Sequence, residues 1–343
     1  MSEPRSISRR DALRITAGVG IGAAFGVGIG AEVLKRAGLH RVSETRIRMG
    51  TSVTLTVVHE HRSEAGAMIG QTFAEMERLE AILSRYRPDS AVGRLNEAGF
   101  LEAAPRELID VLVLSLDVSR RSKGAFDVTV GPLVDFYQEW FDVEHGPPEA
   151  ADVERVLGFV GYDGISIDGE TIRLAHDRMA ISLDGVAKGY IVDRAVACLT
   201  GGGADRVLVD AGGDMTSGGD DLSQEPWTIG IQHPRLADEL VGRVQLSGGS
   251  IATSGDYLRH FTPDHRHYDI LDPRTGRSPG TLSSATVLAP SAAEADALST
   301  AILVLPPREG LTLIDEYEGA ECLLISKSGE DPRLSQGMAA RLG

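Results

Sequence analysis

An acidic and a hydroxyl side chain stand four residues apart near the C-terminus, at Asp296 and Thr300. The apolar residues around them predict a helix over 292–303, and this spacing places both side chains on one face of that helix. Carboxylate and hydroxyl oxygens suit a hard cation such as Mg²⁺. A solvated polar helix face has the same spacing, so these two residues alone leave both interpretations open.

A lysine stands between two glycines at the start of a second predicted helix, in Gly185-Val186-Ala187-Lys188-Gly189. Free backbone N–H groups at a helix start and a lysine ammonium both favour an anion. The segment is not a Walker A loop, because the Gly-x-x-x-x-Gly-Lys-Ser/Thr pattern is missing. A strand that ends in Ala211-Gly212-Gly213-Asp214 offers a second place for close approach of backbone to a ligand, although paired glycines are also typical of a tight turn.

Three further positions carry weaker signals. Asp127 follows Ala125 and Phe126 among apolar neighbours, where a carboxylate without a partner is costly to bury, so we expect it to bind a ligand or to organise a turn. Tyr86 stands between two arginines beyond a predicted helix and could stack on a flat ring, although a solvated helix exit explains it equally well. Met49 precedes a Gly-Thr pair at the start of a predicted strand and by itself indicates only a turn.

Histidines and cysteines offer no clear metal site. His260, His265 and His267 lie in one Pro- and Asp-containing segment without a thiol partner, which disfavours zinc. Cys198 and Cys322 lie in apolar runs, where buried free thiols are expected. A disulfide between them would require an oxidising compartment, and the sequence does not decide it.

Composition indicates a globular protein with an acidic body. The 343 residues are 42% hydrophobic and 24% charged, enough for one large or two modest cores. The formal net charge is −16, and residues 1–48 carry nine basic against four acidic side chains, so the acidic excess lies in the remainder of the chain. Because an acidic body repels polyanions, nucleic acid and anionic membrane surfaces are not expected as partners.

The N-terminus predicts export. Ser8-Arg9-Arg10-Asp11 precedes an apolar, Gly-rich run from Ile15 to Leu34, the pattern of a twin-arginine signal that carries folded proteins across the bacterial inner membrane. An ordinary membrane anchor is the alternative, since no clean Ala-x-Ala cleavage site follows. We therefore expect a signal or anchor over 1–44 and one folded domain over 45–343, in the periplasm or anchored in the inner membrane facing the periplasm.

The elements that must position these residues follow no regular βαβ order. Alternating and apolar runs predict strands at 52–58, 165–167, 171–174, 207–209, 227–232, 241–246, 284–288 and 322–325. Spacings of three and four predict helices over 69–83, 108–116, 189–199 and 292–303. Strands and helices are interspersed, which favours the α+β class with a mixed sheet and packed helices.

The order of these segments resembles the ApbE family. Successive blocks match at Met49-Gly50-Thr51, Tyr86 with Pro88-Asp89-Ser90, 125–129, 185–190, 211–214, Thr253-Ser254-Gly255, 270–276 and 296–300. The resemblance covers roughly residues 47–305 and implies an ApbE-like, T-fold-like α+β domain. It also implies an enzyme that uses Mg²⁺ to transfer FMN from FAD to a threonine hydroxyl of another protein, with release of AMP. The acceptor would be a flavoprotein carrying a Ser/Thr-Gly-Ala-Ser/Thr-x-Thr type of segment.

The resemblance assigns residues to two sites. The positions that would contact FAD are Met49, Tyr86, Ala125, Phe126, Asp127, Ser182, Lys188 and Ile270. The positions that would hold Mg²⁺ are Gly185, through its carbonyl oxygen, with Asp296, Ser299 and Thr300.

Two positions depart from the family pattern. Ser182 stands where the family has a flavin-contacting carboxylate, and Asp269 stands where it has a histidine thought to act as base. Asp269 could still accept a proton, whereas His267 would point to the opposite face of a strand. Two alternatives therefore stay open beside the transferase: hydrolysis of FAD to FMN and AMP, and a non-enzymatic periplasmic FAD-binding protein.

Overall fold

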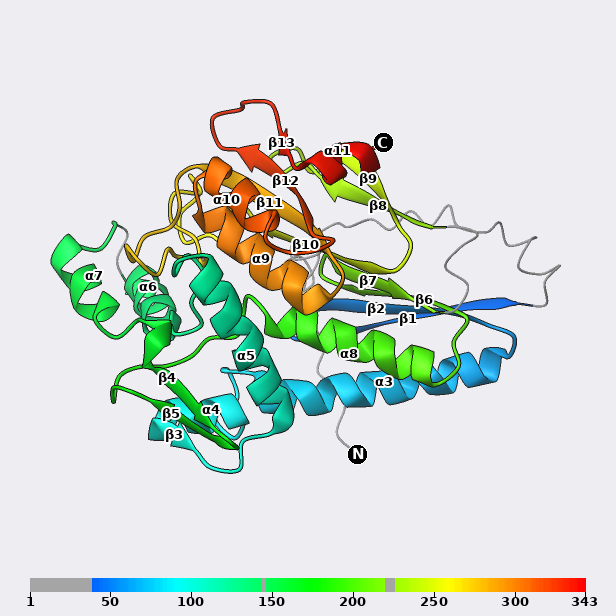
Figure 1. The fold of residues 1–343 in the computed structure, drawn as a ribbon, viewed down its shortest axis with the longest axis horizontal. Coiled ribbons are helices and arrows are strands. Elements are labelled where there is room, and N and C mark those ends of the chain that lie inside the picture. The colour runs from blue at the N-terminus through cyan, green and yellow to red at the C-terminus, as the bar shows by residue number, and fades with distance from the viewer. Residues whose placement is uncertain (1–38, 144–145, 220–225) are drawn as a thin grey trace.

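A single large antiparallel sheet organises the protein. The computed structural model describes residues 39–143, 146–219 and 226–343, so the paired arginines and the apolar run to Leu34 lie outside the described residues (Figure 1). Within those ranges, no helix is long and apolar enough to cross a membrane. The first strand begins at His40, before the boundary expected at Thr45.

The main sheet has the order β1-β2-β6-β7-β10-β11-β12-β13. Its strands are β1 (His40–Arg48), β2 (Thr51–His59), β6 (Arg206–Ala211), β7 (Asp214–Gly218), β10 (Gly249–Gly255), β11 (Leu282–Ala289), β12 (Glu321–Ser326) and β13 (Arg333–Leu334). The α+β class is confirmed. The pairs between these named strands are all antiparallel, rather than the mixture expected, because tight turns join β1 to β2 and β6 to β7 and each later strand also returns beside its neighbour.

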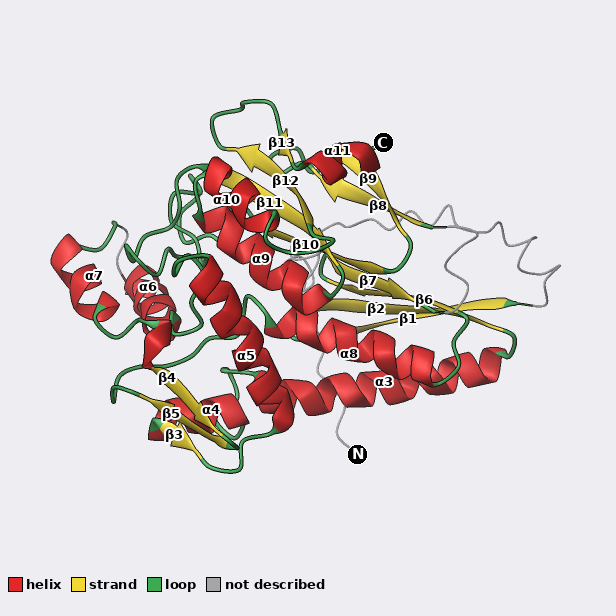
Figure 2. Ribbon diagram, in the orientation of Figure 1, coloured by secondary structure: helices red, strands yellow, loops and turns green. Residues whose placement is uncertain are grey.

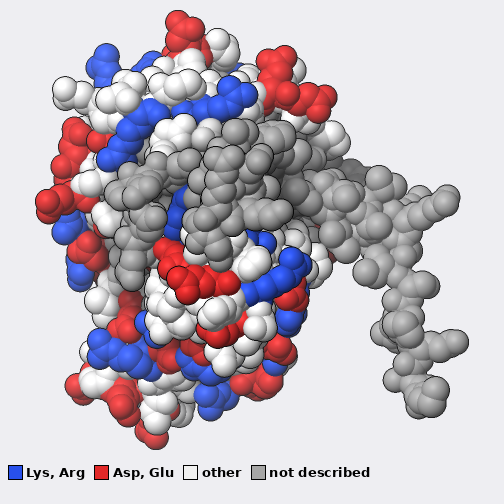
Figure 3. Space-filling model, turned by 90° about the vertical axis from the view of Figure 1, so that its right-hand side faces the viewer, with Lys and Arg blue, Asp and Glu red and all other residues white. Residues whose placement is uncertain are grey.

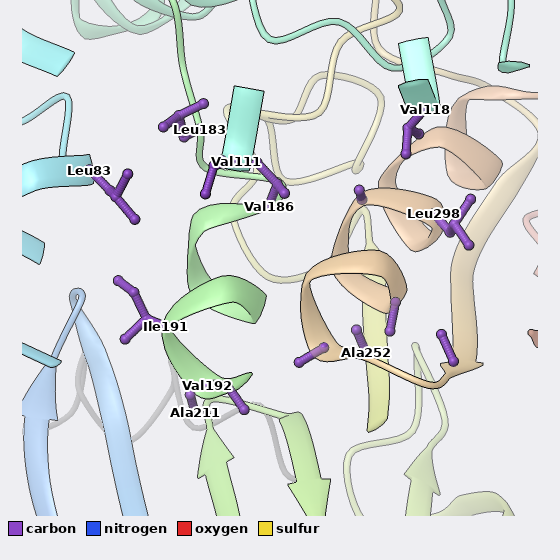
Figure 4. Packing of buried hydrophobic residues seen from close by; sticks show 14 of the residues in the cluster. Leu83, Val111, Val118, Leu183, Val186, Ile191, Val192, Ala211, Ala252 and Leu298 are labelled. Carbon is purple, nitrogen blue, oxygen red and sulfur yellow. The ribbon is translucent and has the colours of Figure 1, made fainter. Parts of the chain in front are cut away.

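Helices cover one face of this sheet (Figure 2). They are α3 (Arg62–Leu83), α5 (Arg106–Arg121), α8 (Ala187–Gly201), α9 (Ala292–Val304) and α10 (Pro307–Ile314). Figure 4 shows Leu83 of α3, Ile191 of α8 and Leu298 of α9 within the apolar core between these helices and the strands. The helices predicted over 69–83, 108–116, 189–199 and 292–303 are confirmed by α3, α5, α8 and α9.

The opposite face of the sheet carries a second, smaller core. It is covered by the hairpin β8 (Trp227–Gln232) and β9 (Leu240–Leu246) and by α11 (Gln336–Arg341). Along β6, Val207 and Val209 pack into the helical core while Leu208 packs into the smaller one. This alternation follows from the two-residue period of a strand, and it explains why the central strands are buried on both faces.

Two smaller units flank the sheet. One combines α4 (Ala91–Ala98) with the sheet β3 (Phe100–Leu101), β5 (Thr171–Leu174) and β4 (Ile165–Asp168), with a 3-10 turn at Tyr162–Gly164. The other contains α6 (Gly131–Val143) and α7 (Ala150–Leu157). Phe141 of α6 stacks on Phe261 with ring centroids 5.4 Å apart, so α6 holds the long loop between β10 and β11 in place.

Charged side chains are dispersed over the surface. Where described residues are visible in Figure 3, acidic and basic groups are interspersed. The net charge of −16 is therefore not gathered into one patch on that face.

Candidate active site

The starts of α8 and α9 are locked together, and they carry the predicted ligands. A Cβ at Gly189 would lie 2.2 Å from the carbonyl oxygen of Ala292, so only glycine permits this approach. Asp193, one turn along α8, accepts hydrogen bonds from the backbone N–H groups of Ala292 and Ala293 at 2.7 and 2.9 Å. These bonds satisfy two free N–H groups at the start of α9 and fix its position against α8.

Lys188 faces two buried carboxylates. Its ammonium donates to Asp214, at the start of β7, and Asp296 accepts a hydrogen bond from the backbone N–H of Gly189 at 3.0 Å. Burial acts to lower the pKa of Lys188, but the charges of Asp214 and Asp296 outweigh burial and raise it. Lys188 is therefore a permanent cation in this site.

Asp296 is a carboxylate without a full counter-charge. Burial, followed by the nearby charge of Asp214, raises its pKa to about 7, while Lys188 and the Gly189 N–H act to lower it. A bound cation would stabilise the charged form of such a group. The electrostatics therefore fit the predicted role of Asp296 as a metal ligand.

Hydroxyl and backbone oxygens gather on the same face of α9. A Cβ at Gly185 would lie 3.0 Å from the hydroxyl oxygen of Thr300, so the Gly185 backbone approaches Thr300 closely. The Ser254 hydroxyl, on β10, lies 3.2 Å from that of Thr300 and 2.8 Å from that of Ser299. Ser299 donates to the carbonyl oxygen of Asp296 at 3.0 Å. These hard oxygen donors fit Mg²⁺, and Ser254 was not among the predicted ligands.

The acidic, histidine and cysteine side chains give no metal cluster of their own. Within the described ranges, no three His, Cys, Asp or Glu side chains form a group that could hold a metal ion. The rings of His260 and His265 meet edge to face, with centroids 4.5 Å apart. Cys198 and Cys322 are both free thiols. Any metal at the α8–α9 site would therefore rely on one carboxylate with hydroxyl and backbone oxygens.

Asp127 organises a turn, which is one of the two roles expected from its sequence. Its Oδ1 accepts from the N–H and the hydroxyl of Thr129 at 2.8 and 2.7 Å, and its Oδ2 accepts from the N–H of Tyr162 at 2.8 Å. Burial raises the pKa of Asp127, while these hydrogen bonds oppose the shift. The turn presents Phe126, whose ring edge lies 3.3 Å from the Cβ position of Gly185, and buries Ala125 beside it.

Tyr86 is exposed and bound to a carboxylate that sequence reasoning did not assign. Its side chain is among the most exposed large hydrophobic groups, at 66%, and its hydroxyl donates to Asp184 at 2.7 Å. Partial desolvation by surrounding residues, followed by the charge of Asp184, raises the pKa of Tyr86 to about 12. Ser182 is buried and accepts from the Asp184 N–H at 3.4 Å. The family pattern has a carboxylate at the position of Ser182. In this protein the nearest carboxylate along the chain is that of Asp184, two residues later.

Asp269 lies at the same end of the site. Its backbone N–H donates to the carbonyl oxygen of Arg259 at 3.1 Å. Burial raises the pKa of Asp269 to about 7; the charge of Arg259 acts to lower it and that of Asp184 to raise it. His267 instead packs on Phe141, with ring centroids 5.3 Å apart, which agrees with the expectation that it faces away.

The remaining predicted positions frame the site. Ile270 is half-buried against the helical core. Met49 occupies the β1–β2 turn with a φ of 50°, and its N–H donates to Glu80 at 3.3 Å. A Cβ at Gly50 would lie 3.8 Å from a guanidinium nitrogen of Arg259, which brings this turn beside the β10–β11 loop. Besides Ser254, the sequence motifs also missed Arg259 and Asp184, because an exposed arginine and an aspartate in a loop carry no spacing signal.

The order and content of this site agree with one known family. The sequence profile of the ApbE family matches residues 49–324, which hold all of the site residues described above. The chain belongs to the ApbE family. An ApbE family domain of this kind spans most of the folded protein, from the β1–β2 turn into β12.

Relatives named FAD:protein FMN transferase match this chain over most of its length and most of their own. Those of Klebsiella pneumoniae and Treponema pallidum are each 30% identical, over 82% and 84% of this chain and 83% and 86% of their own. That of Escherichia coli K12 is 30% identical over 75% of this chain and 76% of its own.

Solved ApbE structures share the fold. The ApbE protein of Thermotoga maritima superposes with a TM-score of 0.78 at 27% identity, covering 88% of this chain and 99% of that one. The flavinyl transferase ApbE of Pseudomonas stutzeri gives 0.77 at 29% identity, covering 89% and 98%. The ApbE-like fold is therefore confirmed.

Proposed function

We propose that this protein is a Mg²⁺-dependent FAD:protein FMN transferase, which moves FMN from FAD to a threonine hydroxyl of a target flavoprotein and releases AMP. The names of the ApbE relatives support the transferase activity. The observation that carries the proposal is the meeting of α8 and α9, where Gly185, Lys188, Asp296 and Thr300 place oxygen ligands beside a permanent cation.

The metal would be held by the Asp296 carboxylate, the Thr300 hydroxyl and the Gly185 carbonyl oxygen, with Ser299 supporting Asp296. Bound there, Mg²⁺ would supply charge neutralisation for the diphosphate of FAD. Lys188 adds a fixed positive charge to the same end of α8. Positioning and charge stabilisation are the main demands of phosphoryl transfer, so contacts dispersed over several elements suit the reaction.

Asp269 is the proposed proton acceptor. The threonine oxygen attacks the phosphorus of the FMN half, the bond from that phosphorus to the bridging oxygen breaks, and AMP leaves with that oxygen. Asp269 takes the proton of the threonine hydroxyl. A pKa of about 7 makes this carboxylate a better base near neutral pH than an ordinary aspartate near 4. Tyr86 and Phe126 would contact the flavin, as the family resemblance implies.

One assay separates the transferase from its alternatives. The purified protein is incubated with FAD, Mg²⁺ and an acceptor protein that carries a Ser/Thr-Gly-Ala-Ser/Thr-x-Thr segment. Covalent flavin on the acceptor threonine together with AMP supports the proposal. Free FMN plus AMP would indicate a pyrophosphatase, and unchanged FAD held by the protein would indicate a binding protein.

The metal assignment has its own variant. Asp296→Ala removes the only carboxylate among the proposed metal ligands, so transfer should lose its dependence on Mg²⁺ and fall to background while the fold persists. Isothermal titration with Mg²⁺ in the presence of FAD, alongside circular dichroism, measures both. An unchanged Mg²⁺ response in Asp296→Ala would rule out this metal site.

We further propose that the enzyme acts outside the cytoplasm, exported by the twin-arginine route and either released into the periplasm or held by its N-terminal segment. The paired Arg9-Arg10 and the apolar run to Leu34 support this proposal. A folded-state export route suits a chain whose sheet pairs distant segments such as β2 with β6.

A further inference from the structure

Arg259 has an exposed, unpaired guanidinium in the middle of the proposed site. Its side chain is exposed, and among the described residues its guanidinium makes no hydrogen bond or ion pair. One guanidinium nitrogen lies 3.8 Å from the Cβ position of Gly50. Its charge also acts on Tyr86, Lys188 and Asp269, which come from three separate segments.

The backbone around Arg259 is held by neighbouring segments, whereas its side chain is exposed. The Arg259 carbonyl oxygen accepts the Asp269 N–H at 3.1 Å, and His260 pairs with Tyr268 as an antiparallel bridge. Phe261 stacks on Phe141 at an interplanar angle of 10°. When a ligand binds a long cationic side chain on a rigid backbone, the loss of conformational entropy is small, because only the rotamers of that side chain lose freedom.

The charges of the site leave Arg259 available for an anion. Asp184, Asp214, Asp269 and Asp296 face this region, and the Lys188 ammonium is already bound to Asp214. Arg85, which lies over the Tyr86 ring, differs from Arg259 because it pairs with Asp135 at 2.5 Å, although its other terminal nitrogen is buried without a partner. An incoming diphosphate therefore meets Arg259 as a cation without an acidic hydrogen-bond partner.

We propose that Arg259 binds a phosphate group of the flavin nucleotide, as a second cation beside Lys188. This assignment rests on the proposed function, since it takes FAD as the ligand. A guanidinium offers a planar fork of donors that matches two phosphate oxygens, which an ammonium cannot reproduce. Neither the spacing of the motifs nor the family resemblance assigns this role to Arg259.

The test compares three flavins that differ in the number of their phosphate groups. Equilibrium dissociation constants of FAD, FMN and riboflavin are measured with Mg²⁺ for the unaltered protein, Arg259→Gln and Arg259→Lys. Arg266→Gln is the matched control, because Arg266 lies on the same loop and its exposed side chain pairs with Asp264.

Loss of the charge-assisted bonds should weaken FAD and FMN by roughly 10- to 100-fold in Arg259→Gln and leave riboflavin unchanged. Arg259→Lys should weaken them less, and Arg266→Gln not at all. The thermal midpoint of unfolding should be the same in the Arg259 variants as in the unaltered protein, because the substitutions break no hydrogen bond or ion pair among the described residues. Unchanged FAD affinity in Arg259→Gln, or an equal loss for riboflavin, would overturn the proposal.

The acceptor assay separates this proposal from the transferase proposal. If the unaltered protein binds FAD through Arg259 but modifies no acceptor, the phosphate contact stands and the transferase proposal fails. If it modifies the acceptor and Arg259→Gln binds FAD normally, the transferase stands and the Arg259 assignment fails.

Discussion

Substitutions of Asp269 test its proposed role as the proton acceptor. General-base help is worth about 10²–10⁴ in rate, so Asp269→Asn should slow transfer by that order while FAD still binds. Asp269→His, which restores the family's residue, should keep or increase the rate. Because the pKa of Asp269 is raised to about 7, single-turnover rates should rise with pH through that value in the unaltered protein and lose this step in Asp269→Asn. Equal rates for Asp269→Asn and the unaltered protein would place the base elsewhere.

The same shift predicts how stability depends on pH. The folded-state pKa of Asp269, about 7, exceeds its ordinary value of 3.8, so folding favours the protonated form. That contribution is fully present below about pH 4 and is lost as pH rises through 7. Asp269→Asn should therefore have a higher melting temperature than the unaltered protein at pH 8, and the gain should vanish towards pH 4. A gain that is constant across this range would contradict the raised pKa of Asp269.

Gly189 sets how closely α8 approaches α9. A Cβ there would lie 2.2 Å from the Ala292 carbonyl oxygen, so Gly189→Ala must push α8 away from α9. We expect a loss of about 1–3 kcal/mol in the free energy of unfolding by urea, as for other overpacked sites, and weaker Mg²⁺ binding because Asp296 moves with the contact. Gly66→Ala is the control: Gly66 lies in α3 with open space around it, so alanine should add roughly 0.5–1 kcal/mol. Equal effects of the two changes would show that the helix contact is not tight.

A buried ion cluster connects distant parts of the molecule. Asp256, at the end of β10, is fully buried and binds Arg235 through two bonds of 2.7 Å and Lys327 at 3.2 Å. Arg235 belongs to the β8–β9 hairpin, and the Lys327 ammonium lies 4.6 Å from the centre of the Tyr268 ring. Tyr268 lies in the β10–β11 loop directly before Asp269, so this cluster supports the part of the loop that carries Asp269.

Removing the shared carboxylate should therefore affect the whole fold. Asp256→Ala leaves two cations without their partner, and we expect a loss of about 2–4 kcal/mol in unfolding free energy, less than for a fully buried pair because Arg235 is partly exposed. Arg106→Ala, which breaks a surface pair with Asp110, should cost under about 0.5 kcal/mol. Urea unfolding measures both. A small effect of Asp256→Ala would show that the cluster is not a structural link.

Export concerns the complete chain. Changing Arg9-Arg10 to two lysines should keep the protein in the cytoplasm, because the twin-arginine route requires that pair. Cell fractionation with immunodetection measures the distribution. Continued appearance of the lysine variant in the periplasm would show that the arginine pair is incidental.

Sequence alone was sufficient for the elements with strong apolar periodicity and for the chemical types of the ligands. The helices α3, α5 and α8 follow from it, because their buried faces recur at helical period. Helix α9 and strand β11, which are buried almost throughout, follow from continuous runs of apolar and small residues. The sequence did not reveal β7 and β10, whose buried positions include Thr216, Ser250 and Ser254. Those hydroxyls pair with other hydroxyls across the fold, which no hydrophobic pattern can show.

Only the tertiary structure decided which polar residues meet. Spacing placed Asp296 beside Thr300 on one helix, but the approach of Gly185 depends on the contact of α8 with α9. Asp127 uses one carboxylate oxygen within its own turn and the other to hold the backbone of Tyr162, which is distant in sequence. The roles of Asp184 and Arg259 arise from contacts between segments far apart in the chain. Local sequence encodes periodicity and turn chemistry, whereas burial, charge balance and the pKa of a carboxylate depend on neighbours that folding alone assembles.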